Sequence, residues 1–64
     1  MKRETAEQYL FYAMTIGEML LTSGAEVGRV EDTIRRICIA YGAERVDVFS
    51  ITSSIVTTMY GEDF

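Results

Sequence analysis

The segment from Ser23 to Gly42, SGAEVGRVEDTIRRICIAYG, constrains the fold most, because it carries the start and stop signals of a helix around an amphipathic repeat. Ser23 and Glu26 have the S-x-x-E spacing of a capping box, in which each side chain bonds a backbone N–H at the helix start. Gly42 suits the left-handed position that ends many helices. The segment therefore predicts a helix over residues 24–41.

Apolar and charged residues of this segment lie on separate sides of the predicted helix. The apolar residues recur at intervals of three and four: Val27, Val30, Ile34, Ile37 and Tyr41. The charges fall off this stripe in two i,i+4 pairs with the acid first, an order that stabilises exposed helices. These pairs are Glu31 with Arg35 and Asp32 with Arg36. One side of the helix should therefore be buried and the other solvated.

The preceding residues predict a first helix over residues 5–22. Thr5 and Gln8 have the spacing of another capping box, and two adjacent apolar rows follow at helical spacing. Three large side chains extend beyond the width that one packing face requires: Phe11, Tyr12 and Met19. The first helix should therefore contact more than the second helix.

Glycines and a short turn indicate that the two helices pack closely. Only Ser23 and Gly24 are available for the connection, so we expect an antiparallel or sharply crossed helical hairpin. Gly17 lies inside the first helix, where glycine costs up to about 1 kcal/mol relative to alanine. Close approach of another backbone is the expected reason for this glycine.

The hydrophobic period changes from 3.6 to 2 after Gly42, which predicts strands. Residues 45–51 are the first predicted strand, with Val46 and Val48 facing one way and Arg45, Asp47, Phe49 and Ile51 facing the other. Ser50 is a candidate for the side of Val46 and Val48. Thr52-Ser53-Ser54 has turn chemistry, and residues 55–60 are rich in β-branched and aromatic side chains. The predicted fold is α+β: one domain, residues 1–64, with a helical hairpin followed by a β-hairpin, the helices on one face of the sheet.

A two-stranded hairpin leaves unpaired strand edges and is marginal by itself. We therefore expect the chain to self-associate. Either the strands pair with those of a second copy, or the side of the first helix that carries Phe11, Tyr12 and Met19 packs against its copy.

Composition excludes several classes of partner and site. The net charge of −4 argues against nucleic acid, since phosphate binding needs clustered Lys and Arg. With no histidine and a single cysteine, Cys38, the chain offers no zinc set and no internal disulfide, and we expect no metal and no cofactor. Cys38 is expected to be a small buried apolar residue. The longest apolar-rich window, Tyr9 to Leu21, is shorter than the ~20 residues of a membrane span.

The first candidate binding site lies at the start of the second predicted helix. Its residues are Ser23, Gly24, Glu26, Arg29, Glu31 and Asp32. Free amides at a helix start and a nearby arginine can hold a carboxylate of a substrate or partner. Capping and a solvated charged face explain most of these residues without a ligand, and we favour that explanation. Arg29 has no i,i+4 acid and is the residue least explained by helix chemistry.

A second candidate is a cluster of hydroxyl side chains near Asp47. Its members are Ser50, Thr52, Ser53, Ser54, Thr57 and Thr58. Serine catalysis requires an activating base within hydrogen-bond reach, and the chain has no histidine. Strand and turn propensity explains the cluster more simply, so we predict no catalytic residue.

The stretch LLTSGAEVGRVEDTIRRICIAYGAERVDVFSITSSIV resembles the opening of the threonine/serine exporter family of membrane proteins. The resemblance spans about Leu20 to Thr58. Its most specific part is SGAEVGRVEDTIRRI, followed by VDVF and SSIV in the same order. In that family a soluble N-terminal region precedes a bundle of transmembrane helices, so the resemblance implies that this chain is a fragment of an exporter.

The resemblance implies the N-terminal cytoplasmic portion of a membrane exporter of threonine, serine or a related small organic acid, and not an enzyme. The expected partners are a second copy, the membrane portion of the same protein or a partner subunit, and a small anionic or zwitterionic substrate. One alternative is a self-associating interaction or regulatory module of the transporter. A hydrolase-like domain, suggested by family analogy, is the second alternative.

Overall fold

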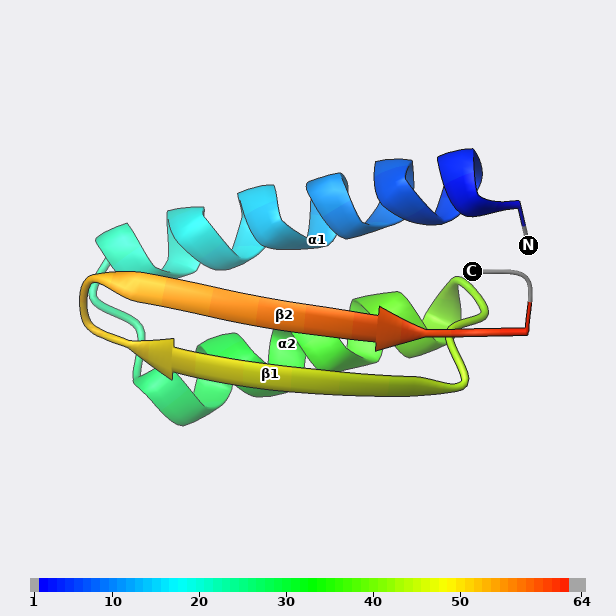
Figure 1. Ribbon diagram of the computed structural model, residues 1–64. Coiled ribbons are helices and arrows are strands. Elements are labelled where there is room, and N and C mark those ends of the chain that lie inside the picture. The colour runs from blue at the N-terminus through cyan, green and yellow to red at the C-terminus, as the bar shows by residue number, and fades with distance from the viewer. Residues whose placement is uncertain (1, 63–64) are drawn as a thin grey trace.

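The structure, a computed structural model, describes residues 2–62 and consists of two helices followed by two strands. Helix α1 spans Arg3–Thr22 and α2 spans Val27–Ala40, while strand β1 spans Arg45–Ile51 and β2 spans Ser54–Tyr60. The helices run in opposite directions, and the two strands form an antiparallel hairpin (Figure 1). The predicted α+β fold is confirmed.

Helix α2 buries the apolar stripe that its sequence predicts. Val30 and Ile34 are fully buried, and so is Cys38, as expected for a small apolar residue beside this stripe. Tyr41, at the end of the stripe, is half exposed, and its ring stacks on that of Tyr9 in α1 with centroids 4.1 Å apart. The stripe therefore faces the core between α1 and the sheet, and its last residue contacts α1 directly.

The end of α2 follows the prediction made from Gly42. Gly42 has φ +107°, a backbone conformation that glycine adopts without a Cβ penalty. Its N–H donates to the carbonyl of Ile39, and the N–H of Ala43 donates to that of Cys38. This is the Schellman pattern, which satisfies two carbonyls at the helix end and turns the chain toward β1.

Both predicted capping boxes are wrong. Helix α1 already begins at Arg3, and the Ala6 N–H donates to the Lys2 carbonyl, so Thr5 lies inside the first turn. Helix α2 begins at Val27, and no side chain caps it. Ser23 instead ends α1: its Oγ donates to the Met19 carbonyl at 2.7 Å.

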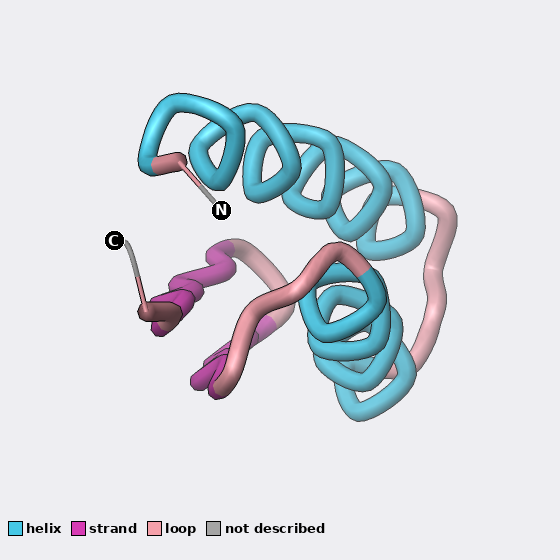
Figure 2. Tube along the Cα trace, turned by 90° about the vertical axis from the view of Figure 1, so that its right-hand side faces the viewer, coloured by secondary structure: helices cyan, strands magenta, loops and turns pink. Residues whose placement is uncertain are grey.

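Alternation along the strands separates the core side of the sheet from its outer side. Val46 and Ser50 are buried, and Val48 between them is half-buried, as predicted. Phe49 faces outward and pairs across the hairpin with Val56. Both helices lie on the same side of the sheet, with α2 beside β1 (Figure 2). None of the elements within residues 2–62 therefore covers the outer side of the sheet.

Gly17 lies where α1 packs closely against α2. An alanine Cβ at this position would lie 2.5 Å from Cδ1 and 2.9 Å from Cγ1 of Ile34. The neighbour that approaches Gly17 is thus the side chain of Ile34 in α2, where we had expected a backbone. The fully buried core around this contact is small and consists of Ala13, Val30, Ile34 and Cys38, extended by Ala43 and Val46.

Candidate functional site

The connection between the helices contains three of the six residues predicted to bind a substrate or partner. Ser23 and Gly24 close α1, where Gly24 has φ +87° and its N–H donates to the Leu21 carbonyl. Glu26 precedes α2, and its backbone carbonyl accepts from the N–H groups of Arg29 and Val30 at 3.0 and 3.1 Å. In the structure these three residues therefore form the end of α1 and the start of α2.

The acidic residues of the predicted site point in different directions. Oε2 of Glu31 accepts a hydrogen bond from the backbone N–H of Ser50 in β1 at 2.8 Å, so the predicted Glu31–Arg35 pair is wrong. Asp32 pairs with Arg36 at 2.9 Å, as predicted. Glu31 thus joins α2 to the sheet, whereas Asp32 belongs to the exposed side of α2.

Arg29 is the remaining predicted site residue, and its side chain is exposed near the start of α2. Its backbone carbonyl accepts from the Thr33 hydroxyl at 2.8 Å. No hydrogen bond or ion pair of the described residues brings the Arg29 side chain together with those of Glu31 or Asp32. A binding role for these residues stays a prediction.

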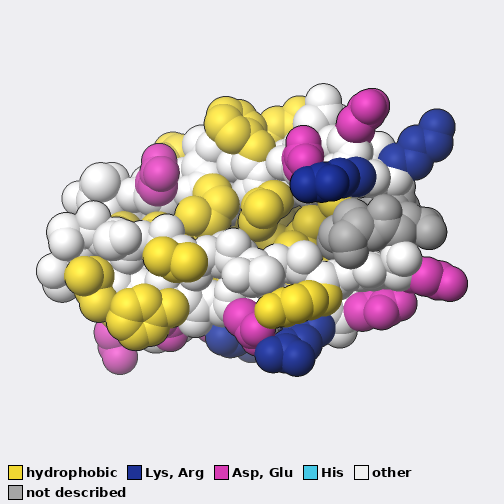
Figure 3. All heavy atoms as spheres, in the orientation of Figure 1, with side chains coloured by type: hydrophobic (Ala, Val, Ile, Leu, Met, Phe, Trp, Pro, Cys, Tyr) yellow, Lys and Arg dark blue, Asp and Glu magenta, His cyan; other side chains and the backbone are white. Residues whose placement is uncertain are grey.

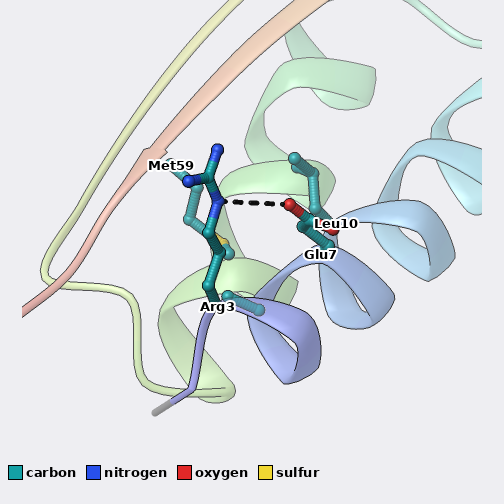
Figure 4. Close-up of a pocket in the computed structure, with 5 residues that line it drawn as sticks. Arg3, Glu7, Leu10 and Met59 are labelled. Atoms are coloured by element: carbon teal, nitrogen blue, oxygen red, sulfur yellow. Dashed lines mark ion pairs between the residues drawn. The ribbon is translucent and has the colours of Figure 1, made fainter. Parts of the chain in front are cut away.

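A groove that we did not predict from the sequence lies between the first turns of α1 and the end of β2 (Figure 4). It has a volume of about 350 Å³ and is lined by Arg3, Ala6, Glu7, Leu10 and Met59. Nε of Arg3 lies 3.3 Å from Oε1 of Glu7, and both side chains are largely exposed. A guanidinium and a carboxylate beside apolar side chains suit the two charged ends of a zwitterion. Such a ligand would only have to replace an exposed ion pair, which contributes little to stability.

Part of this groove could be inferred from the sequence. Arg3 and Glu7 have i,i+4 spacing, and Ala6 and Leu10 belong to the apolar row beside them. Met59 comes from β2, more than forty residues later in the chain, and its position depends on how α1 lies over the sheet. Local spacing carries no signal for that placement.

The hydroxyl cluster does not assemble around an activating base. Arg45 binds Asp47 through two hydrogen bonds, Nε to Oδ1 at 3.3 Å and a terminal nitrogen to Oδ2 at 2.9 Å. The hydrogen bond from Arg45 lowers the pKa of the Asp47 carboxyl, which makes it a weaker base. Thr57 donates to Sδ of Met14 at 3.1 Å, so it joins β2 to α1. Asp47 and Thr57 therefore have structural partners.

Among the described residues, neither the cysteine nor the acidic side chains show an activated or metal-binding arrangement. Cys38 is buried, and burial raises the pKa of its thiol, which lowers the fraction of the reactive thiolate. Among residues 2–62, no three His, Cys, Asp or Glu side chains come together in a way that could hold a metal ion. In the same part of the chain, neither helix is both long and apolar enough to cross a membrane.

Comparisons with known proteins identify the family. The chain matches the ThrE family model, described as "Putative threonine/serine exporter", over residues 11–64. Comparisons with curated proteins and with solved structures find no match. The matched region contains most of α1 and all of α2, β1 and β2. The chain therefore belongs to the threonine/serine exporter family.

Proposed function

We propose that this chain acts as the N-terminal cytoplasmic portion of a membrane exporter of threonine, serine or a related small organic acid. The family match over residues 11–64 is the observation that carries the proposal. The two helices of the described residues lack the character of membrane spans, in agreement with a region that folds outside the bilayer. In this proposal the chain has no catalytic role, and the membrane portion of the exporter carries out translocation.

Export is tested with the intact gene product that contains this chain. Cells that lack it are loaded with threonine, serine or a small dicarboxylic acid, and the appearance of each compound outside the cells is followed. The intact gene should restore release of at least one of them, and a gene lacking the codons for residues 3–60 should not. Equal release with and without the gene for all three compounds would refute the proposal.

Arg29 tests whether the start of α2 takes part in transport. Arg29→Ala should lower export while the helical content of the chain stays unchanged, because the side chain is exposed. Arg36→Ala is the matched control, since Arg36 is an exposed arginine of the same helix that pairs with Asp32. If the two variants export equally, Arg29 has no specific role.

Sidedness is tested with a cysteine at Thr58, an exposed position on the outer side of the sheet. Thr58→Cys in the intact protein should react with a membrane-impermeant maleimide only after the cells are permeabilised. The native Cys38 is buried, so labelling of the parent protein measures the background maleimide signal from this region. Rapid labelling of whole cells would place this region outside the cytoplasm and contradict the proposal.

A further inference from the structure

Beyond its first two turns, the side of α1 that points away from the core carries almost no charge. From Gln8 to Thr22, Glu18 is the single charged residue of the sequence. Helix α2 differs, because its exposed side carries Arg29, Arg35 and Arg36. A helix that is apolar on nearly all sides is normally covered on all of them. The outer side of α1 therefore has the character of a contact surface.

Four large apolar side chains account for this surface. The exposed fractions are 66% for Phe11, 50% for Tyr12, 41% for Ile16 and 63% for Met19. With roughly 180 Å² available to a fully exposed side chain of this size, the four together expose about 400 Å². Figure 3 shows hydrophobic side chains along α1 as well as on the strands. This area is in the range of functional patches on small proteins.

We infer that two copies of this chain pair through the outer sides of their α1 helices, antiparallel about a two-fold axis near Thr15. The residue numbers support this position, because Thr15 is the midpoint of the run from Gln8 to Thr22. A two-fold axis at Thr15 places residues 8–22 of one copy alongside residues 8–22 of the other over their full length of about 22 Å. It also brings the Tyr12 ring of one copy close to Met19 of the other, and sulfur–aromatic contacts are favourable.

The area and the charge both suit a second copy. Two such patches remove about 800 Å² of apolar surface from water, and apolar area is roughly 60% of a typical interface. The whole interface would then bury about 1,300 Å², above the ~1,000 Å² expected of a specific contact. Two chains of net charge −4 repel each other, and a contact through their least charged side reduces this repulsion.

The outer side of the sheet exposes a similar apolar area but is less suited to pairing. Its Arg45–Asp47 pair would lose water in a face-to-face contact, and desolvating charges is costly. The Arg45 guanidinium also lies 4.8 Å from the centroid of the Tyr60 ring and covers part of it. At the edge of β1, the Ser50 N–H is already bound by Glu31. These groups favour α1 as the surface of self-association.

Sedimentation equilibrium of the 64-residue chain at 1–100 μM tests the dimer. The wild-type mass should approach twice the 7.2 kDa of one chain. Met19→Glu should weaken the dimer at least tenfold. Phe49→Glu should not, although Phe49 is 65% exposed and Met19 63%. Circular dichroism of each variant is the control for folding. A wild-type monomer at 100 μM, or a dimer broken by Phe49→Glu and not by Met19→Glu, would overturn the inference.

A cysteine at the proposed axis gives a test that does not depend on destabilising the dimer. Thr15→Cys should oxidise to a disulfide-linked dimer faster than Thr58→Cys, a position on the sheet that is also exposed to solvent. A residue at a two-fold axis lies beside its own copy, within the range that a disulfide can bridge. Faster linkage of Thr58→Cys would refute the α1 contact. A wild-type chain that stays monomeric and floats with phosphatidylcholine vesicles would assign the surface to a bilayer instead.

Discussion

Replacing Gly17 by alanine tests the contact on which the helix packing depends. A new Cβ would lie 2.5 Å from Cδ1 of Ile34, whereas carbon atoms pack favourably at about 3.5–4.0 Å. Ile34 is fully buried, so its side chain cannot move into solvent to relieve the overlap. Overpacking of a core typically costs about 1–3 kcal/mol. Alanine in place of glycine inside a helix returns up to about 1 kcal/mol. We therefore expect Gly17→Ala to lower the free energy of unfolding by up to ~2 kcal/mol.

Gly28→Ala is the matched control, because Gly28 also lies in a helix and a Cβ added there would meet no packing neighbour within 4 Å. Here only the helix propensity acts, and the variant should gain up to about 1 kcal/mol. The assay is urea unfolding followed by circular dichroism, at one protein concentration because self-association would shift the apparent stability. For a domain of this size, 1 kcal/mol corresponds to a change in Tm of roughly 4–8 °C.

A double-mutant cycle assigns the cost of Gly17→Ala to Ile34. Ile34→Val removes Cδ1, the atom nearest to the new Cβ, and should itself cost about 0.5–1.5 kcal/mol. In that background Gly17→Ala should be less harmful by about 1 kcal/mol, because part of the overlap is gone. If Gly17→Ala stabilises the parent chain as much as Gly28→Ala does, the close contact between Gly17 and Ile34 does not exist.

Three further predictions concern polar contacts and use urea unfolding. Ser23→Ala should lower the free energy of unfolding by under ~0.5 kcal/mol, less than the ~1 kcal/mol typical of removing an N-cap. A larger loss of stability would support the capping-box interpretation instead. Glu31→Ala should cost about 1.5–3 kcal/mol and Glu31→Gln less, because an amide oxygen still accepts from Ser50; equal losses would contradict this role. Asp47, whose pKa the hydrogen bond from Arg45 lowers, stabilises the fold above the unfolded pKa of about 3.9 and stops doing so as pH falls through its folded pKa. Asp47→Asn should reduce the acid dependence of stability, and unchanged dependence would exclude a contribution.

The order of elements was predictable because each is specified by its own periodicity. The stripe through Val30 and Ile34 repeats at helical intervals, while Val46 and Ser50 lie on the same side of a strand. Gly42 also predicted correctly where α2 ends, since few residues other than glycine adopt φ +107°. The first residue of a helix depends on which of two local patterns is satisfied, and the prediction failed at the starts of both helices.

Ser23 shows how one sequence motif can be overridden by its neighbour. An N-cap residue has extended backbone angles, but Ser23 has φ −83° and ψ 1°, close to helical. Gly24 follows at once and supplies the positive φ of a Schellman turn. That turn satisfies carbonyls of α1 through the N–H groups of Gly24 and Ala25. Ser23 therefore completes the first helix, and the second cannot begin until Val27.

Glu31 shows why the candidate site was harder to predict than the fold. Its sequence neighbours offer Arg35 at i,i+4, and an exposed pair of that kind contributes about 0.3–0.5 kcal/mol. The competing partner is the N–H of Ser50, a buried residue nineteen positions later in the chain, at 2.8 Å. A hydrogen bond to a charged group contributes about 1.5–3 kcal/mol, and leaving a buried N–H unbonded costs a similar amount. The tertiary contact therefore wins by about 1 kcal/mol or more, and no local pattern reveals it, because it exists only once β1 has packed beside α2.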